Sequence, residues 1–182
     1  MKYTHLAVAA ALAVGALSAQ AADPTASLNR TFAEYTGNGP IGNNNLNVSK
    51  FYWMFEGTGT WMGQAVNSWF LIWDPVNASV NGSVTFDSQI LFLQDDKSEL
   101  IATSSFNKPG VTYNYNNSLV GLEAGDKSGT SFSGNTLTLA WNAADPGDHV
   151  RIMTAVPEPE AYALALAGLG VIGWFGRRRR AD

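Results

Sequence analysis

Hydrophobic and polar residues alternate along much of the chain between residues 50 and 152, and this period of two is typical of β-strands. Residues 50–55 place three aromatic side chains on one face. Residues 68–73 are bulky on both faces, which predicts a strand buried between two layers. A proline at position 75 ends that strand, because proline cannot donate to a β-ladder.

Turn signals separate the remaining apolar runs. Asn81-Gly82 lies between two short alternating stretches and predicts a hairpin with a type I′ turn, since both residues tolerate positive φ. No window before residue 156 has a 3.6-residue apolar stripe. Further strands are expected at 89–93, 100–103, 111–115, 119–123, 136–141 and 149–152. Short strands at this spacing predict an antiparallel, jelly-roll-like β-sandwich over residues 22–155.

The first 21 residues have the three-part pattern of a secretory signal peptide. Lys2 is followed by an apolar run over 6–17, and small residues stand at Ala19 and Ala21. Twelve apolar residues are too few to cross a bilayer core of about 30 Å as a helix. We therefore expect export, with cleavage between Ala21 and Ala22.

Residues 156–182 combine three unlike features in order. Val156-Pro157-Glu158-Pro159 is a stiff, extended rod, because proline fixes its own φ and restricts the residue before it. Residues 161–176 carry no charge and would form a helix of about 24 Å, a little short for an average bilayer. The arginines after it predict a cytoplasmic end by the positive-inside rule. They are Arg177, Arg178, Arg179 and Arg180.

Charge and cysteine content exclude several classes of protein. The formal net charge of the chain is −4, but residues 22–155 alone contain twelve acidic and six basic side chains, which leaves that part near −6. This argues against nucleic-acid binding, which needs a positive face. With no cysteine, the chain has no disulfide, no thiolate metal site and no cysteine nucleophile.

Few residues offer candidate chemistry. His149 could act as a general base oriented by Asp145 or Asp148, but a strand-start residue beside a tight turn is the interpretation we favour. Calcium could bind the acidic stretches 95–99 or 145–148, although neither matches an EF-hand and both are typical of solvated turns. We predict no catalytic residue, no metal and no cofactor.

Four tryptophans at strand spacing allow two interpretations. Such residues are most often core, since each buries on the order of 150–250 Å². Exposed in a row, they could instead stack on sugar rings. They are Trp53, Trp61, Trp69 and Trp73. Paired carboxylates could also hydrolyse glycosides, with Asp87, Asp95, Glu99 and Glu123 as candidates.

The ordered tail resembles the PEP-CTERM sorting signal of Gram-negative bacteria. Pro157-Glu158-Pro159, the apolar segment 161–176 and the four arginines correspond to its three parts. The resemblance implies export through the Sec machinery and signal peptidase, and transient anchoring in the inner membrane. It further implies cleavage by an exosortase and transfer to the cell surface or matrix, in bacteria that export exopolysaccharide.

The middle of the chain also looks like a recurrent cargo domain of such proteins, for which no activity is assigned. The stretches that carry this weaker resemblance are 66–75, 82–87, 121–123 and 146–151. Three hypotheses follow for the exported part. The first is a non-enzymatic surface or matrix protein linked to exopolysaccharide and biofilm. The second is a carbohydrate-binding module, and the third is a polysaccharide hydrolase.

Overall fold

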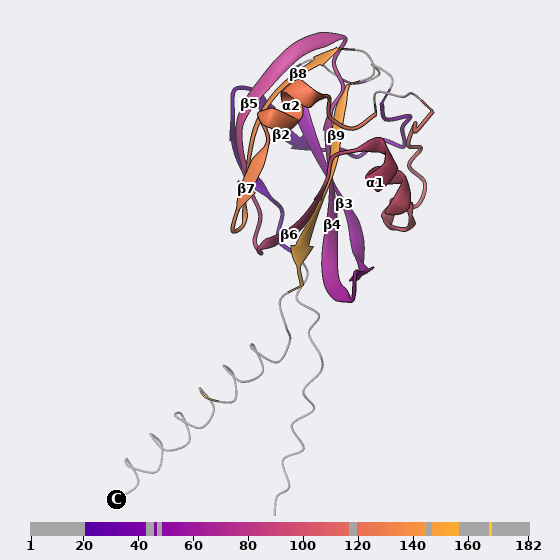
Figure 1. Cartoon of the computed structure of the whole chain (residues 1–182), viewed down its shortest axis with the longest axis vertical. Helices are drawn as coiled ribbons and strands as arrows, with labels where there is room; N and C mark the ends of the chain where they lie inside the picture. Colours follow the sequence, from indigo (N-terminus) through magenta and orange to yellow (C-terminus); the bar gives the residue numbers. More distant parts are fainter. Residues whose placement is uncertain are drawn as a thin grey trace, which may run out of the picture. The chain divides into compact units, whose positions relative to one another are not determined.

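Two β-sheets pack against each other in the computed structural model of the chain (Figure 1). It describes residues 21–42, 46, 49–116, 120–144, 147–156 and 168, and residues 21–156 form one compact unit. The first sheet has the order β1-β5-β8-β7 and the second the order β2-β3-β4-β9-β6. The predicted all-β sandwich is confirmed. The strands are β1 (Thr25–Leu28), β2 (Thr31–Glu34), β3 (Lys50–Trp61), β4 (Gln64–Trp73), β5 (Asn77–Thr85), β6 (Ile90–Gln94), β7 (Ser131–Ser133), β8 (Thr136–Ala144) and β9 (Asp148–Ala155).

The strand pairs are antiparallel with one exception. Strand β2 runs parallel to β3, with Thr31 opposite Lys50 and Glu34 opposite Trp53. Both β1 and β2 lie before residue 50, where the sequence analysis predicted no strand. They are short edge strands whose residues are mostly polar or half-exposed, so they lack the apolar alternation on which the prediction depended.

The second sheet is buried on both faces, as the pattern of residues 68–73 predicted. In β4, Trp69, Leu71 and Trp73 point into the main core between the two sheets. Phe70 and Ile72 point to the opposite face, where a second apolar cluster forms. Helix α1 (Lys97–Ala102) covers that face on the side away from β5 and β8, and its Leu100 belongs to the second cluster (Figure 1).

The predicted hairpin at Asn81-Gly82 is wrong. Strand β5 runs straight through these two residues, and Gly82 pairs with Leu139 of β8. Gly82 has a φ of +134°, and any side chain there would collide with the backbone oxygen of Ser27 in β1. The glycine serves the close approach of a neighbouring strand and not a turn.

Other predicted strands are absent from the described residues or replaced by helix. Residues 100–103 lie at the end of α1, and a 3₁₀ turn, η1 (Ser104–Phe106), follows. Within 111–115 and the described part of 119–123, the structure shows only the isolated bridges Ile41–Tyr113 and Asp96–Gly121. A second short helix, α2 (Ala124–Ser128), comes next and lies beside β8.

The two ends of the compact unit meet the same short segment. The backbone N–H of Ala22 donates to Oδ2 of Asp87 at 2.8 Å. The N–H of Ala155, at the end of β9, donates to the carbonyl of Gln89 at 2.8 Å. The chain therefore enters and leaves the sandwich at neighbouring positions.

Candidate functional site

The predicted sorting residues lie mainly beyond the described part of the chain. Val156 follows β9 directly and is half-buried. Ala19, Pro157, Glu158 and Pro159 lie outside the described residues, as do the four arginines and all of the segment 161–176 except Gly168. Among the described residues, none of the helices has the length and apolar character that crossing a membrane requires. The predicted membrane segment thus stays a prediction.

Three of the four tryptophans considered for sugar stacking are core residues. The exposed fractions of Trp53, Trp69 and Trp73 are 7%, 1% and 0%. The indole N–H of Trp69 donates to Thr154 at 3.2 Å, and that of Trp73 donates to the carbonyl of Ala78 at 3.0 Å. No ring face of these three is available to a sugar.

Trp61 alone of the four is half-exposed, at the end of β3. The four tryptophans therefore form no row of exposed, coplanar rings. The prediction that Trp53, Trp69 and Trp73 could stack on sugars is wrong. The sequence could not separate the two interpretations, because core and surface aromatics have the same strand spacing.

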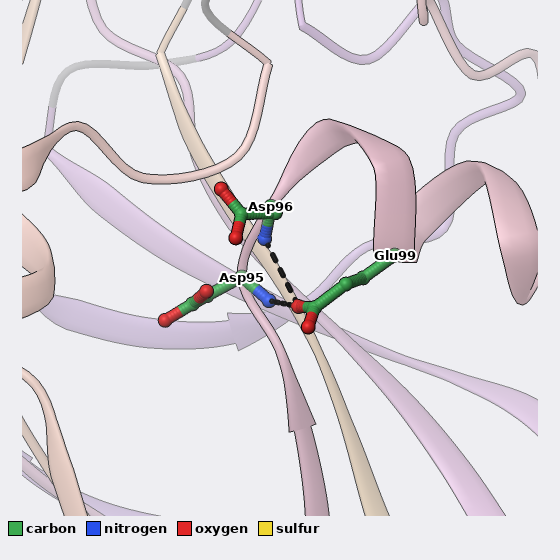
Figure 2. A group of neighbouring side chains, drawn as sticks. All are labelled: Asp95, Asp96 and Glu99. Atoms are coloured by element: carbon green, nitrogen blue, oxygen red, sulfur yellow. Dashed lines mark hydrogen bonds between the residues drawn. The ribbon is translucent and has the colours of Figure 1, made fainter.

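A first acidic cluster, Asp95, Asp96 and Glu99, lies at the start of α1 (Figure 2). Figure 2 shows the Glu99 carboxylate turned back toward the backbone of Asp95 and Asp96. Its Oε2 accepts the backbone N–H of Asp95 at 3.0 Å and that of Asp96 at 3.3 Å. These are N–H groups that the first turn leaves free, so Glu99 acts as a helix cap.

A lysine neutralises the two aspartates of this first cluster. Lys127 in α2 forms ion pairs with Asp95, at 3.4 Å, and with Asp96. Burial raises the pKa of Asp95, while Lys127 opposes that shift. Capping and ion pairing together account for the cluster, so it needs no metal to be stable.

A second acidic cluster is formed by residues from distant parts of the chain. Glu123 precedes α2, Asp126 lies within α2, and Asp148 is the first residue of β9. One carboxylate oxygen from each lies within 4.8 Å of those of the other two. Asp126 is held by the N–H of Asn142 in β8, which donates to its Oδ1 at 2.8 Å.

Asp148 is the only fully buried member of this cluster. Its exposed fraction is 0%, and neither carboxylate oxygen has a hydrogen-bond partner among the described residues. Burial raises the pKa of Asp148, and the charges of Asp126, Glu123 and Asp74 raise it further. The sequence had placed Asp148 in a solvated turn. It is instead fully buried, beside the carboxylates of Glu123 and Asp126.

His149, the candidate base, has its ring on the opposite face of β9. The ring stacks on Phe70 at 6.1 Å between centroids, and neither ring nitrogen has a hydrogen-bond partner among the described residues. Burial lowers the pKa of His149, although Asp74 acts in the other direction. The ring borders a cavity of about 10 Å³ that is also lined by Tyr113 and Asn114, enough for about one water molecule.

A buried ion pair that the sequence did not predict joins β3 and β9, the strands on either side of β4, to α1. Arg151 of β9 donates from Nε and Nη2 to the two carboxylate oxygens of Glu56, at 2.6 and 2.7 Å. Glu56 lies at a β-bulge of β3, between Phe55 and Gly57. Its oxygens also accept hydrogen bonds from Ser68 and Tyr113.

The other guanidinium hydrogens of Arg151 go to the end of α1 and the segment after it. Nη1 donates to the carbonyls of Leu100 and Thr103, at 3.1 and 2.9 Å, and to the Thr103 hydroxyl. Nη2 also donates to Asn107 at 2.7 Å. A charged residue in the interior of each of two largely apolar stretches was the signal that could have revealed the pair.

Comparison with known proteins identifies the tail. The model of the PEP-CTERM protein-sorting motif matches residues 155–180. No curated protein and no solved structure matches the chain. The motif begins at Ala155, the last residue of β9, and includes the Pro-Glu-Pro, the apolar segment and the arginines. The chain is therefore an exported, exosortase-sorted protein whose precursor is anchored in a membrane at its C-terminus.

Proposed function

We propose that the β-sandwich is a non-catalytic protein of the cell surface or extracellular matrix, linked to exported polysaccharide and released from its precursor by exosortase. The observation that carries this proposal is the sorting motif at 155–180, which begins where the last strand ends. Every strand residue except Ala155 precedes the motif.

The position of β9 determines where cleavage leaves the domain intact. Strand β9 lies between β4 and β6 in the second sheet, and its residues are almost all buried. A cut before Ala155 would remove part of a central strand and open both cores. A cut at or after Pro157 would leave every strand in place. Proline favours extended polyproline geometry without internal hydrogen bonds, so we expect a protease to bind Pro157-Glu158-Pro159 without unfolding the sandwich.

The non-catalytic role is supported by the surroundings of the candidate catalytic groups. His149 is buried, and no hydroxyl or carboxylate of the described residues is hydrogen-bonded to its ring nitrogens. Glu99 is occupied by backbone N–H groups, and Asp95 by Lys127. The carbohydrate-binding alternative depended on exposed tryptophans, and three of the four are buried, so we do not propose it.

Sorting is tested by measuring the mass of the mature protein from cells with and without exosortase. We expect loss of Arg177–180 only when exosortase is present. Glu158→Ala should block the cut, whereas Glu160→Ala, one residue outside the Pro-Glu-Pro, should leave it unchanged. Retention of the arginines in cells with active exosortase would contradict the proposal.

The link to polysaccharide needs its own experiment. Cells with and without polysaccharide synthesis are fractionated into membrane, matrix and medium, and the processed protein is quantified in each. We expect it in the matrix of producing cells and in the medium of non-producing cells. An identical distribution in both strains would refute the polysaccharide link while leaving exosortase sorting intact.

A further inference from the structure

The second acidic cluster concentrates negative charge that no cationic side chain among the described residues neutralises. Glu123, Asp126 and Asp148 bring three carboxylates together, and no lysine or arginine among the described residues forms an ion pair with them. The nearby Lys127 is engaged by the first acidic cluster. Burying an unpaired carboxylate is costly unless a cation or proton compensates it.

Asp148 provides an observation beyond the clustering of acids. Its side chain is fully buried, and neither oxygen accepts a hydrogen bond from a donor among the described residues, although one of them lies within 4.8 Å of oxygens of both Glu123 and Asp126. A carboxylate that served only as a structural cap would accept N–H groups, as Glu99 does in the first cluster. The Asp148 carboxylate instead lies close to the carboxylate oxygens of Glu123 and Asp126. Several oxygen acceptors that converge in this way are the arrangement that binds a metal ion.

We propose that Glu123, Asp126 and Asp148 form a calcium-binding site. All three offer carboxylate oxygens, and a purely oxygen donor set suits a hard cation and not zinc or copper. Calcium–oxygen distances of about 2.3–2.6 Å allow ligand atoms up to about 5 Å apart around one ion. The oxygens of the cluster meet that limit without movement of the backbone.

Water is needed to complete the coordination shell. Three carboxylates supply three to six oxygens, depending on how many bind through both atoms, whereas calcium takes about 6–8. Glu123 is exposed, so water at its carboxylate can fill the remaining positions. Magnesium demands a tighter octahedron and binds carboxylate cages less readily.

Calcium would fasten the two sheets to each other. Asp148 begins β9 of the second sheet, and Asp126 is hydrogen-bonded to β8 of the first. The ion would thus join the segment around α2 to both layers. We expect the affinity of extracellular calcium modules, with a Kd of about 10⁻⁴–10⁻³ M.

The test uses the purified full chain in a mild detergent, after treatment with a chelator. Calorimetric titration with CaCl₂ should show binding, and 10 mM calcium should raise the Tm by about 3–10 °C at constant ionic strength. Magnesium at the same concentration should bind at least about tenfold more weakly. Equal effects of the two ions would overturn the assignment to calcium.

Three variants separate the site from general electrostatics. Glu123 is exposed, so Glu123→Gln should fold normally and reduce the affinity for calcium about tenfold or more. Asp148→Asn should abolish calcium binding. Asp96→Asn, in the first acidic cluster, is the matched control and should bind calcium like the wild type. A wild type that shows neither binding nor a Tm shift would overturn the proposal, and so would an unchanged affinity in Glu123→Gln. If the wild type shows neither binding nor a Tm shift, a proton and not a metal ion neutralises Asp148.

Discussion

Replacing Arg151 by methionine should destabilise the sandwich more than any exposed charge does. The substitution keeps an apolar stem but leaves the Glu56 carboxylate buried without its bidentate partner. It also removes the donor to the carbonyls of Leu100 and Thr103. Removing one partner of a buried pair typically costs about 3–5 kcal/mol, and we expect about 4 kcal/mol here because several acceptors lose their donor together.

Urea unfolding of the full chain in detergent, followed by tryptophan fluorescence, measures this loss. With an m value of about 2 kcal/mol/M, a loss of 4 kcal/mol lowers the midpoint by about 2 M. Arg30→Met is the matched control. Arg30 is only half-buried, and its Nε donates to the carbonyl of Ser79, so the expected loss is about 1 kcal/mol or less.

A double variant tests whether the lone carboxylate is the cause. Arg151→Met combined with Glu56→Gln removes both charges, so it should be less destabilised than the sum of the two single variants by at least about 1 kcal/mol. Strictly additive losses would refute the reasoning. A loss in Arg151→Met no larger than in Arg30→Met would refute it as well.

Two further substitutions test local geometry in the same unfolding assay. Gly82→Ala should cost about 3 kcal/mol, because the residue has a φ of +134° and its new Cβ would meet the backbone of β1. Gly134→Ala, at a φ of +58° with open space around it, should cost only about 1 kcal/mol; equal losses would show that the close approach of β1 does not matter. Glu99→Ala removes the cap of α1 and should cost about 1 kcal/mol, with faster amide hydrogen exchange confined to the first turn of that helix; unchanged exchange there would contradict the capping role.

The strands with apolar alternation could be predicted from the sequence. Residues 50–55, 68–73, 136–141 and 149–152 all lie in strands of the structure, and the burial of 68–73 on both faces followed from its bulky residues. Alternation is a local property of the chain, so it can be read without knowledge of the partner strands.

Elements whose conformation depends on distant contacts could not be predicted. Asn81-Gly82 has the local signal of a turn, but the approach of β1 decides its conformation. Helix α1 has six residues and only Leu100 is buried, so it is too short to show a helical period. The second acidic cluster was missed for the same reason. Asp148 is more than twenty residues from Glu123 and Asp126, and only the packing of α2 against β8 brings them together.

Ala22 and Ala155, near the two ends of the sandwich, are both hydrogen-bonded to the segment 87–89. A force applied at the sorting motif therefore acts on the sandwich at this one place. Tension from the C-terminal segment acts on the hydrogen bond of Ala155 before it reaches either core. Asp148 lies at the other end of β9, about 23 Å from Ala155 at 3.3 Å per residue. A tether at the sorting motif therefore leaves the proposed calcium site at the free end, where ions from the surroundings can reach it and lock the two sheets after export.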